Sequence, residues 1–203
     1  IDELNYIKEK NKYIEVGATT PLSKFEPIIK KYYPDFDRIL KRYGSVQIRN
    51  VATLAGNIAT ASPIGDSLPL LLSLDASISI ESFNKKMTIP LKDFFIGYRK
   101  TKLRKGYFIS SIKIPIFKKN IFKAYKISKR IDDDISSVCA SFNLEIVNKK
   151  IKDIKIAYGG MAAIPKRPLY CEKMLLNSSF SEDTILTAHK SLEKDFQPID
   201  DMR

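Results

Sequence analysis

The sequence of 203 residues predicts an α+β fold in which helices come first, antiparallel strands follow and helices end the chain. Helical patterns occupy most of residues 20–43, alternating apolar and polar residues recur between 77 and 158, and helical patterns return from 167 onward. The sequence has no repeated strand–helix–strand order and no G-x-G-x-x-G motif, which disfavours a doubly wound dinucleotide-binding fold.

The first elements are expected to be a short strand and two helices. Thr20 and Pro21 supply an N-cap and a first-turn proline for the first helix, which the Tyr32-Tyr33-Pro34 stretch interrupts. Gly44 occupies the C′ position that ends the second helix. The expected ranges are a strand at 13–17 and helices at 20–31 and 35–43.

Residues 45–66 have neither a helical nor a strand period and are predicted to form a long loop. The segment contains Gly56, Asn57, Pro63 and Gly65 among many small polar residues, which is typical of loops. Segments of this length without secondary structure inside a compact domain are usually functional.

After this loop, a short buried helix at 68–74 precedes a series of antiparallel strands. Turns are expected at 84–86 and 148–150, and a proline followed by charged residues marks a domain boundary near 115–120. Two helices end the chain, the second of them capped by Ser181. The predicted ranges are strands at 77–83, 87–91, 107–115, 122–128, 137–147 and 151–158 and helices at 167–176 and 181–194.

The composition argues against two classes of protein. The net charge of +12 comes from 27 Lys and only 8 Arg, scattered along the chain, so it favours diffuse solubilising charge over a nucleic-acid surface with clustered Arg. No apolar run approaches the ~20 residues that span a bilayer, and no secretory leader opens the sequence. We expect no nucleic-acid partner and no membrane span.

Metal chemistry is not expected from this chain alone. Cys139 and Cys171 have no C-x-x-C spacing, so by themselves they build neither an iron–sulfur cluster nor a zinc site, and a disulfide framework is not expected. The only histidine, His189, has no second ligand at i+3 or i+4 and is predicted to be an ordinary surface or half-buried side chain.

The segment 49–66 is the best candidate for a binding site. Ala55-Gly56-Asn57 would let a ligand approach the backbone closely, because nothing bulky projects and glycine can adopt a positive φ. Free amides in such turns bind anions. Asp66 precedes the helix at 68–74, so it is either a simple N-cap or part of this site. Composition permits phosphate or ring binding here, and tight packing of small residues is the alternative.

Residues 43–66 resemble the flavin-binding segment of the molybdenum hydroxylases, specifically the FAD part of the xanthine dehydrogenases. Three further stretches resemble the same family, and four ordered motifs are far more specific than one. They are G-Y-R-K-T at 97–101, Y-K-I-S-K-R-I-D-D-D-I-S at 125–136 and Y-G-G-M-A-A-I-P-K-R at 158–167. The S-P-I-G-D and K-I-S-K-R sequences favour xanthine dehydrogenases over carbon monoxide dehydrogenase flavoproteins.

The resemblance implies two domains. Residues 1–116 would be the second subdomain of the FAD-binding domain, an antiparallel sheet with helices. Residues 117–203 would be a domain like the C-terminal domain of the CO dehydrogenase flavoprotein, a small antiparallel sheet packed with helices. This sequence would have no counterpart of the first FAD-binding subdomain, the iron–sulfur domain or the molybdenum subunit. The cysteine count agrees with the missing iron–sulfur domain, because two cysteines cannot hold its clusters.

The resemblance also assigns flavin contacts. Tyr43 would offer an aromatic face to a ring, with capping of a helix end as the alternative. Lys126 would place positive charge near the pyrimidine edge of the flavin, and Ile109 would contact a flavin or adenine ring, although either could be an ordinary strand residue. The backbone amides of 53–57 would contact the phosphate and ribityl groups. The assigned contacts are Tyr43, Thr53, Leu54, Ala55, Gly56, Asn57, Asp66, Ile109 and Lys126.

One departure and two weaker candidates accompany these contacts. The family usually has two glycines before the Asn, so Ala55 would weaken flavin binding if its position needed a positive φ. Residues 130–134 resemble a mobile loop that influences NAD access, with a charged surface turn as the alternative. Tyr98 is a weaker candidate for the nicotinamide side.

These implications lead to one functional hypothesis and one alternative. The first is the FAD component of a xanthine dehydrogenase-like molybdenum hydroxylase, which accepts electrons from 2Fe-2S clusters onto FAD and passes them to NAD. Such an oxidoreductase would belong to purine catabolism, lie in the cytoplasm within a hetero-oligomer, and be inactive as an isolated chain. The alternative is an interaction module that completes a flavin site or a subunit interface without binding FAD alone.

Overall fold

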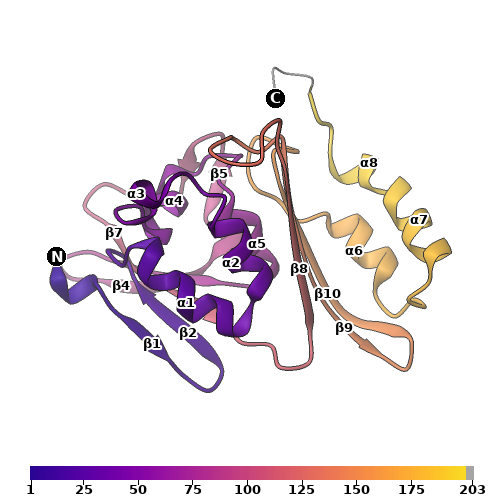
Figure 1. Ribbon diagram of the computed structural model, residues 1–203, viewed down its shortest axis with the longest axis horizontal. Coiled ribbons are helices and arrows are strands. Elements are labelled where there is room, and N and C mark those ends of the chain that lie inside the picture. Colours follow the sequence, from indigo (N-terminus) through magenta and orange to yellow (C-terminus); the bar gives the residue numbers. More distant parts are fainter. Residues whose placement is uncertain (200–203) are drawn as a thin grey trace.

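The computed structural model describes residues 1–199 and has the predicted α+β fold, with two main antiparallel sheets and a small hairpin sheet (Figure 1). The helices are α1 (Leu22–Tyr32), α2 (Pro34–Leu40), α3 (Val46–Arg49), α4 (Leu54–Thr60), α5 (Ser67–Ser73), α6 (Leu169–Leu175), α7 (Glu182–Lys190) and α8 (Leu192–Asp195). The strands are β1 (Ile7–Glu9), β2 (Tyr13–Gly17), β3 (Ser77–Glu81), β4 (Lys86–Pro90), β5 (Phe95–Gly97), β6 (Lys100–Thr101), β7 (Phe108–Pro115), β8 (Ile121–Ile127), β9 (Val138–Val147) and β10 (Lys150–Gly159).

The larger sheet has five strands in the order β1-β2-β7-β3-β4, all of them antiparallel. Its alternating pattern makes one face apolar along β2, β7 and β3, where Ile14 is paired with Ile114 and Ile78 with Ile112. These isoleucines are completely buried, in one core cluster with side chains of α1, α2, α4 and α5. Burial of this face is what makes the strand pattern so regular.

The smaller sheet has three strands in the order β10-β9-β8 and is covered on both faces. Ala157 and Ile156 are neighbours in β10 and point to opposite faces, because successive strand residues alternate. Ala157 joins the main core, and Ile156 joins a small core beneath α6 and α7. Since Ala124, Cys139 and Ala157 are packed with residues of the larger sheet and its helices, both sheets share one core.

The long loop predicted at 45–66 is wrong, because α3 and α4 lie within it. Each helix begins at a hydroxyl cap: Ser45 Oγ accepts from Ile48 N at 3.3 Å, and Thr53 Oγ1 accepts from Gly56 N at 3.0 Å. The helices have only 4 and 7 residues, too short to show a helical period in the sequence. Gly56 is therefore a helical residue, and the positive φ expected of it is wrong.

Several element boundaries also differ from the predictions. The Tyr32-Tyr33-Pro34 stretch ends the first helix as predicted, because α1 ends at Tyr32, but Pro34 itself begins α2, and α2 ends at Leu40 instead of Tyr43. Thr20 does not cap α1, because its hydroxyl donates to Tyr6 O at 3.0 Å and Pro21 is the N-cap residue. The strands β1, β5 and β6 were not expected, and the helix predicted at 181–194 is divided at Ser191.

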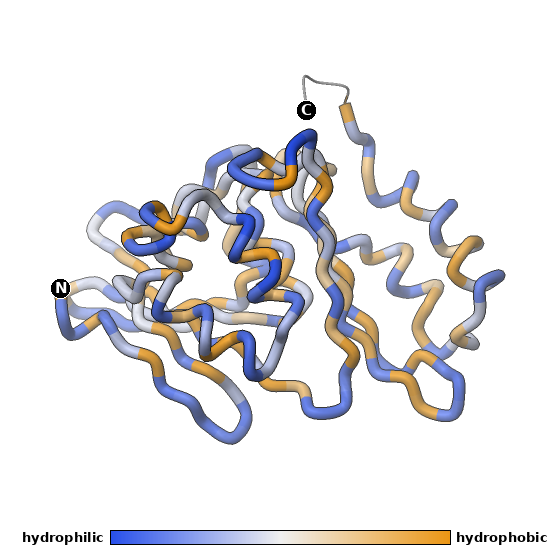
Figure 2. Tube along the Cα trace, viewed as in Figure 1, coloured by the Kyte–Doolittle hydropathy of each residue, from blue (hydrophilic) through white to orange (hydrophobic). Residues whose placement is uncertain are grey.

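Hydropathy follows this architecture. Figure 2 shows the hydrophobic stretches inside strands and helices, while the turn between β1 and β2 is hydrophilic. Among residues 1–199, no helix has the length and apolar character needed to cross a membrane.

Candidate functional site

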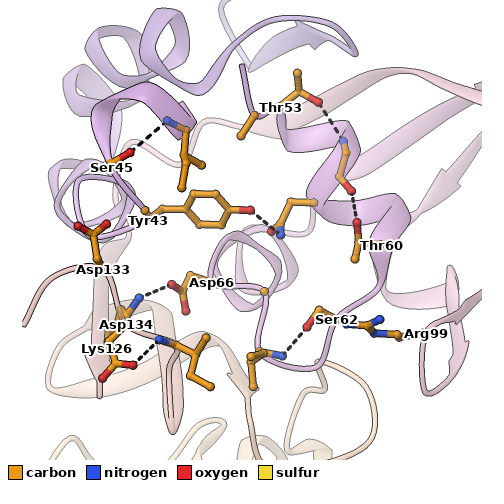
Figure 3. A pocket seen from close by; sticks show the side chains of 18 residues that line it. Tyr43, Ser45, Thr53, Thr60, Ser62, Asp66, Arg99, Lys126, Asp133 and Asp134 are labelled. Carbon is orange, nitrogen blue, oxygen red and sulfur yellow. Dashed lines mark hydrogen bonds and ion pairs between the residues drawn. The ribbon is translucent and has the colours of Figure 1, made fainter. Parts of the chain in front are cut away.

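A cavity of about 800 Å³ lies where α3, α4, the start of α5, the β5–β6 hairpin and the loop after β8 meet (Figure 3). We refer to it as the main cavity. The segment from Tyr43 to Asp66, which the sequence singled out as the candidate binding segment, supplies most of its wall. Its lining residues are Tyr43, Gly44, Ser45, Ile48, Ala52, Thr53, Gly56, Asn57, Thr60, Ser62, Ile64, Gly65, Asp66, Arg99, Lys126, Asp133, Asp134 and Ile135.

Asp66 and Lys126 form a buried ion pair at this cavity. Lys126 Nζ lies 2.7 Å from Asp66 Oδ2, and the two side chains are 2% and 6% exposed. Ser136 Oγ donates to the other carboxylate oxygen, and Lys126 Nζ also donates to Arg42 O at 3.1 Å. Each charge thus has two polar partners, which compensates for the loss of water around a buried pair.

The pair corrects one expectation for Asp66. Its backbone occupies the N-cap position of α5, but its side chain accepts no hydrogen bond from that helix. The carboxylate turns instead toward β8 and the residue that precedes β9. Asp66 therefore connects the segment 43–66 to the smaller sheet, and a simple N-cap role for its side chain is wrong.

Tyr43 presents a neutral phenol beside this pair. Burial raises the pKa of Tyr43, the negative charge of Asp66 raises it further, and the hydrogen bond from Asn57 acts in the opposite direction. Asn57 Nδ2 donates to Tyr43 Oη at 3.1 Å, while Asn57 Oδ1 accepts from Ser67 Oγ at 2.6 Å. The phenol oxygen is thus an acceptor within the protein, and its own proton can be donated to a ligand in the cavity.

The first turn of α4 forms another part of the wall. The amide of Gly56 donates to Thr53 Oγ1 at 3.0 Å, and the amide of Asn57 donates to Thr53 O at 3.1 Å. Leu54 and Ala55 carry the first-turn amides that have no partner inside a helix. Ala55 itself is a buried helical residue that packs in the core, so its position needs no glycine.

The loop after β8 is fastened to the end of α2 by Arg42. Its guanidinium donates to Ile131 O at 2.8 Å, to Lys126 O at 3.0 Å and to Ser128 Oγ at 2.9 Å. Within the loop, Asp134 accepts from the backbone amides of Arg130 and Ile135, both at 2.9 Å. The amide of Arg130 is the main reason why the pKa of Asp134 is lowered, so its carboxylate stays charged beside the cavity.

The structure brings together many, but not all, of the residues assigned from the sequence. Leu54, Ala55 and Ile109 are buried in the main core and are not among the lining residues of the main cavity. Ile109 is paired with Ile80 in the larger sheet. The assigned residues that do line the main cavity are Tyr43, Thr53, Gly56, Asn57, Asp66 and Lys126.

The β5–β6 hairpin contributes a residue that the sequence interpretation missed. Arg99 lines the main cavity, whereas its neighbour Tyr98 is 61% exposed and is not a lining residue. Arg99 has a positive φ of 51° at the hairpin turn, and its guanidinium lies 5.9 Å from the Tyr98 ring centroid. Arg99 belongs to the G-Y-R-K-T motif at 97–101, so the sequence did contain a signal for it, but the sequence interpretation favoured Tyr98 of the same motif.

The wall chemistry suits a large ring system with polar edges. An aromatic ring, small residues and hydroxyl groups line the main cavity, together with the Asp66–Lys126 pair and Arg99. Among residues 1–199, no group of three or more His, Cys, Asp or Glu side chains is arranged to hold a metal ion. The fold and this cavity together define a binding protein for an organic cofactor of flavin size.

Comparison with known families gives this class its identity. Residues 1–117 match the family model described as the FAD binding domain in molybdopterin dehydrogenase, and residues 123–203 match the CO dehydrogenase flavoprotein C-terminal domain. The chain therefore belongs to the FAD-binding family of the molybdopterin dehydrogenases, as its motifs indicated. It is a flavoprotein component of the molybdenum hydroxylase family of oxidoreductases.

Similarity to individual relatives supports this family assignment. The chain is 40% identical over 179 residues to a xanthine dehydrogenase of Blastobotrys adeninivorans, covering 79% of this chain and 13% of that protein. It is 28% identical to the glyceraldehyde dehydrogenase medium chain of Sulfolobus acidocaldarius, covering 100% of this chain and 73% of that one. The fold matches carbon monoxide dehydrogenase from Hydrogenophaga pseudoflava with a TM-score of 0.93 at 24% identity, covering 100% of this chain and 71% of that chain.

The extent of the match differs between these relatives. The chain spans 15% of the length of the xanthine dehydrogenase of Emericella nidulans, to which it is 33% identical. It thus corresponds to the flavoprotein region within a much longer protein in one set of relatives, and to most of a separate medium chain in the other.

Proposed function

We propose that this chain is the flavin-binding part of a xanthine dehydrogenase-like molybdenum hydroxylase, in which electrons from 2Fe-2S clusters pass through FAD to NAD. The observation that carries the proposal is the main cavity, which gathers Tyr43, Asp66 and Lys126 from separate segments of the chain. Bound FAD would supply a two-electron carrier that can exchange electrons with single-electron clusters and with a hydride acceptor.

Each lining residue has a physical role in this proposal. The Tyr43 ring packs against the flavin, and its hydroxyl is held by Asn57. The Asp66–Lys126 pair offers a fixed dipole rather than a free positive charge, because the carboxylate lies only 2.7 Å from the ammonium. This dipole orients the polar edge of the ring. Thr53 and Gly56, which line the cavity at the start of α4, contact the phosphate and ribityl groups, while Leu54, Ala55 and Ile109 support the wall from the core.

The proposal includes partners. Iron–sulfur and molybdenum-binding domains or subunits would complete a hetero-oligomer, and the loop 130–134 beside the cavity would influence the approach of NAD. The name of the Sulfolobus acidocaldarius relative, a medium chain, supports assembly with other chains. The names of the xanthine dehydrogenase relatives support purine oxidation as the setting. The proposal places the enzyme in the cytoplasm and makes the isolated chain inactive, because its electron source lies elsewhere.

The test uses the complete enzyme with Asp66→Asn and Lys126→Met combined, since the double change leaves no unpaired buried charge. We expect a loss of bound FAD and of NAD reduction, while an artificial acceptor that takes electrons from the clusters still works. The matched control is Glu81→Gln with Lys86→Met, which removes an ion pair whose atoms lie 2.5 Å apart on β3 and β4, outside the main cavity. Unchanged FAD content and unchanged NAD reduction in the first variant would contradict the proposal. If wild-type protein that has been given FAD and purified again shows no flavin absorbance, the interaction-module alternative is supported.

A further inference from the structure

A second cavity, of about 500 Å³, lies on the other side of the β5–β6 hairpin. We call it the hairpin cavity. It shares no lining residue with the main cavity: Arg99 at the hairpin turn faces the main cavity, whereas Ile96 and Thr101 face this one. Its lining residues are Ile80, Met87, Ile89, Ile96, Thr101, Lys102, Leu103, Arg104 and Tyr107.

The hairpin cavity has an apolar floor. Ile80 and Met87 are directly paired across β3 and β4, and Ile89 lies two residues further along β4, so all three project from the same face of the sheet. Ile96, Leu103 and Tyr107 complete the apolar wall from the hairpin side. Such a slot between a flat sheet face and an aromatic ring accepts a planar ring and removes it from water.

Two cations stand at this apolar slot without an acid to neutralise them. Lys102 and Arg104 are both exposed, and neither takes part in an ion pair or a side-chain hydrogen bond within residues 1–199. The segment 99–105 contains five basic residues and no acidic one. This concentration contrasts with the scattered lysines elsewhere, and it is the kind of clustered charge that attracts an anion.

The cationic segment is also held in place before any ligand binds. Lys102 N donates to Phe94 O at 2.9 Å, and Leu103 N donates to Thr101 Oγ1 at 3.2 Å. Tyr107 N donates to Arg104 O at 3.0 Å across a turn in which Gly106 has a φ of +83°. That left-handed residue makes the turn a glycine position and fixes Arg104 and Tyr107 relative to each other. A preorganised site loses less entropy on binding.

We propose that the hairpin cavity binds an adenosine 5′-phosphate group, with the base in the apolar slot against Tyr107 and the phosphate on Lys102 and Arg104. Two neighbouring cations match the charge of a phosphate dianion better than that of a single carboxylate. The volume of about 500 Å³ accommodates a nucleotide. The group can come from a free nucleotide or from one half of a dinucleotide.

The test measures binding of AMP to the complete protein with FAD added to saturation, so that the main cavity is not the site observed. We expect AMP to bind, and adenosine and inorganic phosphate each to bind at least tenfold more weakly, because each uses only half of the site. The variant Lys102→Ala with Arg104→Ala should weaken AMP binding about tenfold and leave adenosine binding unchanged. The control Lys118→Ala with Lys119→Ala removes the same charge from the exposed connection between β7 and β8 and should have no effect.

A second variant tests the apolar slot independently of the cations. Met87→Glu replaces a 41% exposed side chain and puts a carboxylate into the apolar slot where the base would bind. We expect the binding of adenosine and of AMP both to be lost. Displacement of AMP by NAD supports the proposal and assigns the group to a dinucleotide, and the absence of displacement supports a free nucleotide. Any of three results would overturn the proposal: equal affinity for phosphate and AMP, tighter binding of the fatty-acid anion decanoate than of AMP, or normal AMP binding by the Lys102/Arg104 double variant.

Discussion

Removal of one partner of the Asp66–Lys126 pair should destabilise the fold far more than removal of a surface pair. In Lys126→Met, the Asp66 carboxylate remains only 6% exposed and keeps Ser136 as a partner but loses its counter-charge. Leaving one buried charge uncompensated typically costs about 3–5 kcal/mol. We expect Asp66→Asn to cost a similar amount, because it leaves the Lys126 ammonium, only 2% exposed, without a counter-charge. The single amide oxygen of Asn can also replace only one of the two carboxylate oxygens that accept from Ser136 and Lys126.

The assay is urea unfolding of the chain followed by circular dichroism, with all four members of the double-mutant cycle. With a slope of roughly 2 kcal/mol per M urea, Lys126→Met should lower the midpoint by about 2 M. The double variant should recover a large part of this loss, since a pair replaced by neutral groups leaves no buried charge. The exposed pair of Lys31 and Glu9, with side chains 63% and 34% exposed, is the control, and its removal should leave the urea midpoint nearly unchanged.

Two results would refute this reasoning. One is a loss of less than about 1 kcal/mol in Lys126→Met, which would mean that Asp66 is hydrated or protonated at little cost. The other is strict additivity of the two single variants, because contacting buried charges must show a coupling energy.

Three further predictions concern other parts of the fold. Arg167→Met should cost about 3 kcal/mol in the same urea assay, because it strips two hydrogen bonds, at 2.9 and 2.7 Å, from the buried Glu172 carboxylate. Burial raises the pKa of Tyr33 and of Tyr158 to about 12, so ultraviolet titration should show both phenols ionising after the others. Because the pKa is higher in the folded chain than in the unfolded chain, the contribution of these phenols to stability is complete below pH ~10 and is lost as the pH rises through 12. Burial raises the pKa of the Cys139 thiol well above its ordinary value, so a thiol reagent at pH 8 should leave it unlabelled until the chain is unfolded, and rapid labelling of the native chain would contradict its placement.

The sequence predicted the regular sheet strands better than it predicted the short elements. Strands such as β2 and β8 bury alternate side chains along most of their length, so the sequence itself shows the strand period. The helices α3 and α4 owe their existence to caps and to packing of a few side chains, and their composition is that of a loop. Pro34 was correctly expected to separate two helices, and it also begins the second one, since proline is as favourable at the first turn of a helix as it is unfavourable inside one.

The candidate site shows the same division between local and long-range information. The segment 43–66 was identifiable from its own residues, but the partners of Asp66 were not, because Lys126 is 60 positions and Ser136 is 70 positions away. Only the family resemblance linked Asp66 and Lys126 before the structure was known. Arg42 was missed altogether, because in the sequence it is one more cation near a helix end.

The long-range contacts also connect assembly of the site to assembly of the core. Arg42 and Asp66 belong to the helices beside the larger sheet, while the atoms that they bind belong to β8 and to the residues between β8 and β9. Ala124 packs in the shared core from the same strand that carries Lys126. Neither sheet with its own helices can therefore form the main cavity alone, because Tyr43 and Asp66 lie on one side of the junction and Lys126 and Asp134 on the other. A change that loosens this junction should lower flavin binding and the free energy of unfolding together, whereas a change confined to the cavity wall, such as Thr60→Ala, should affect flavin binding with little loss of stability.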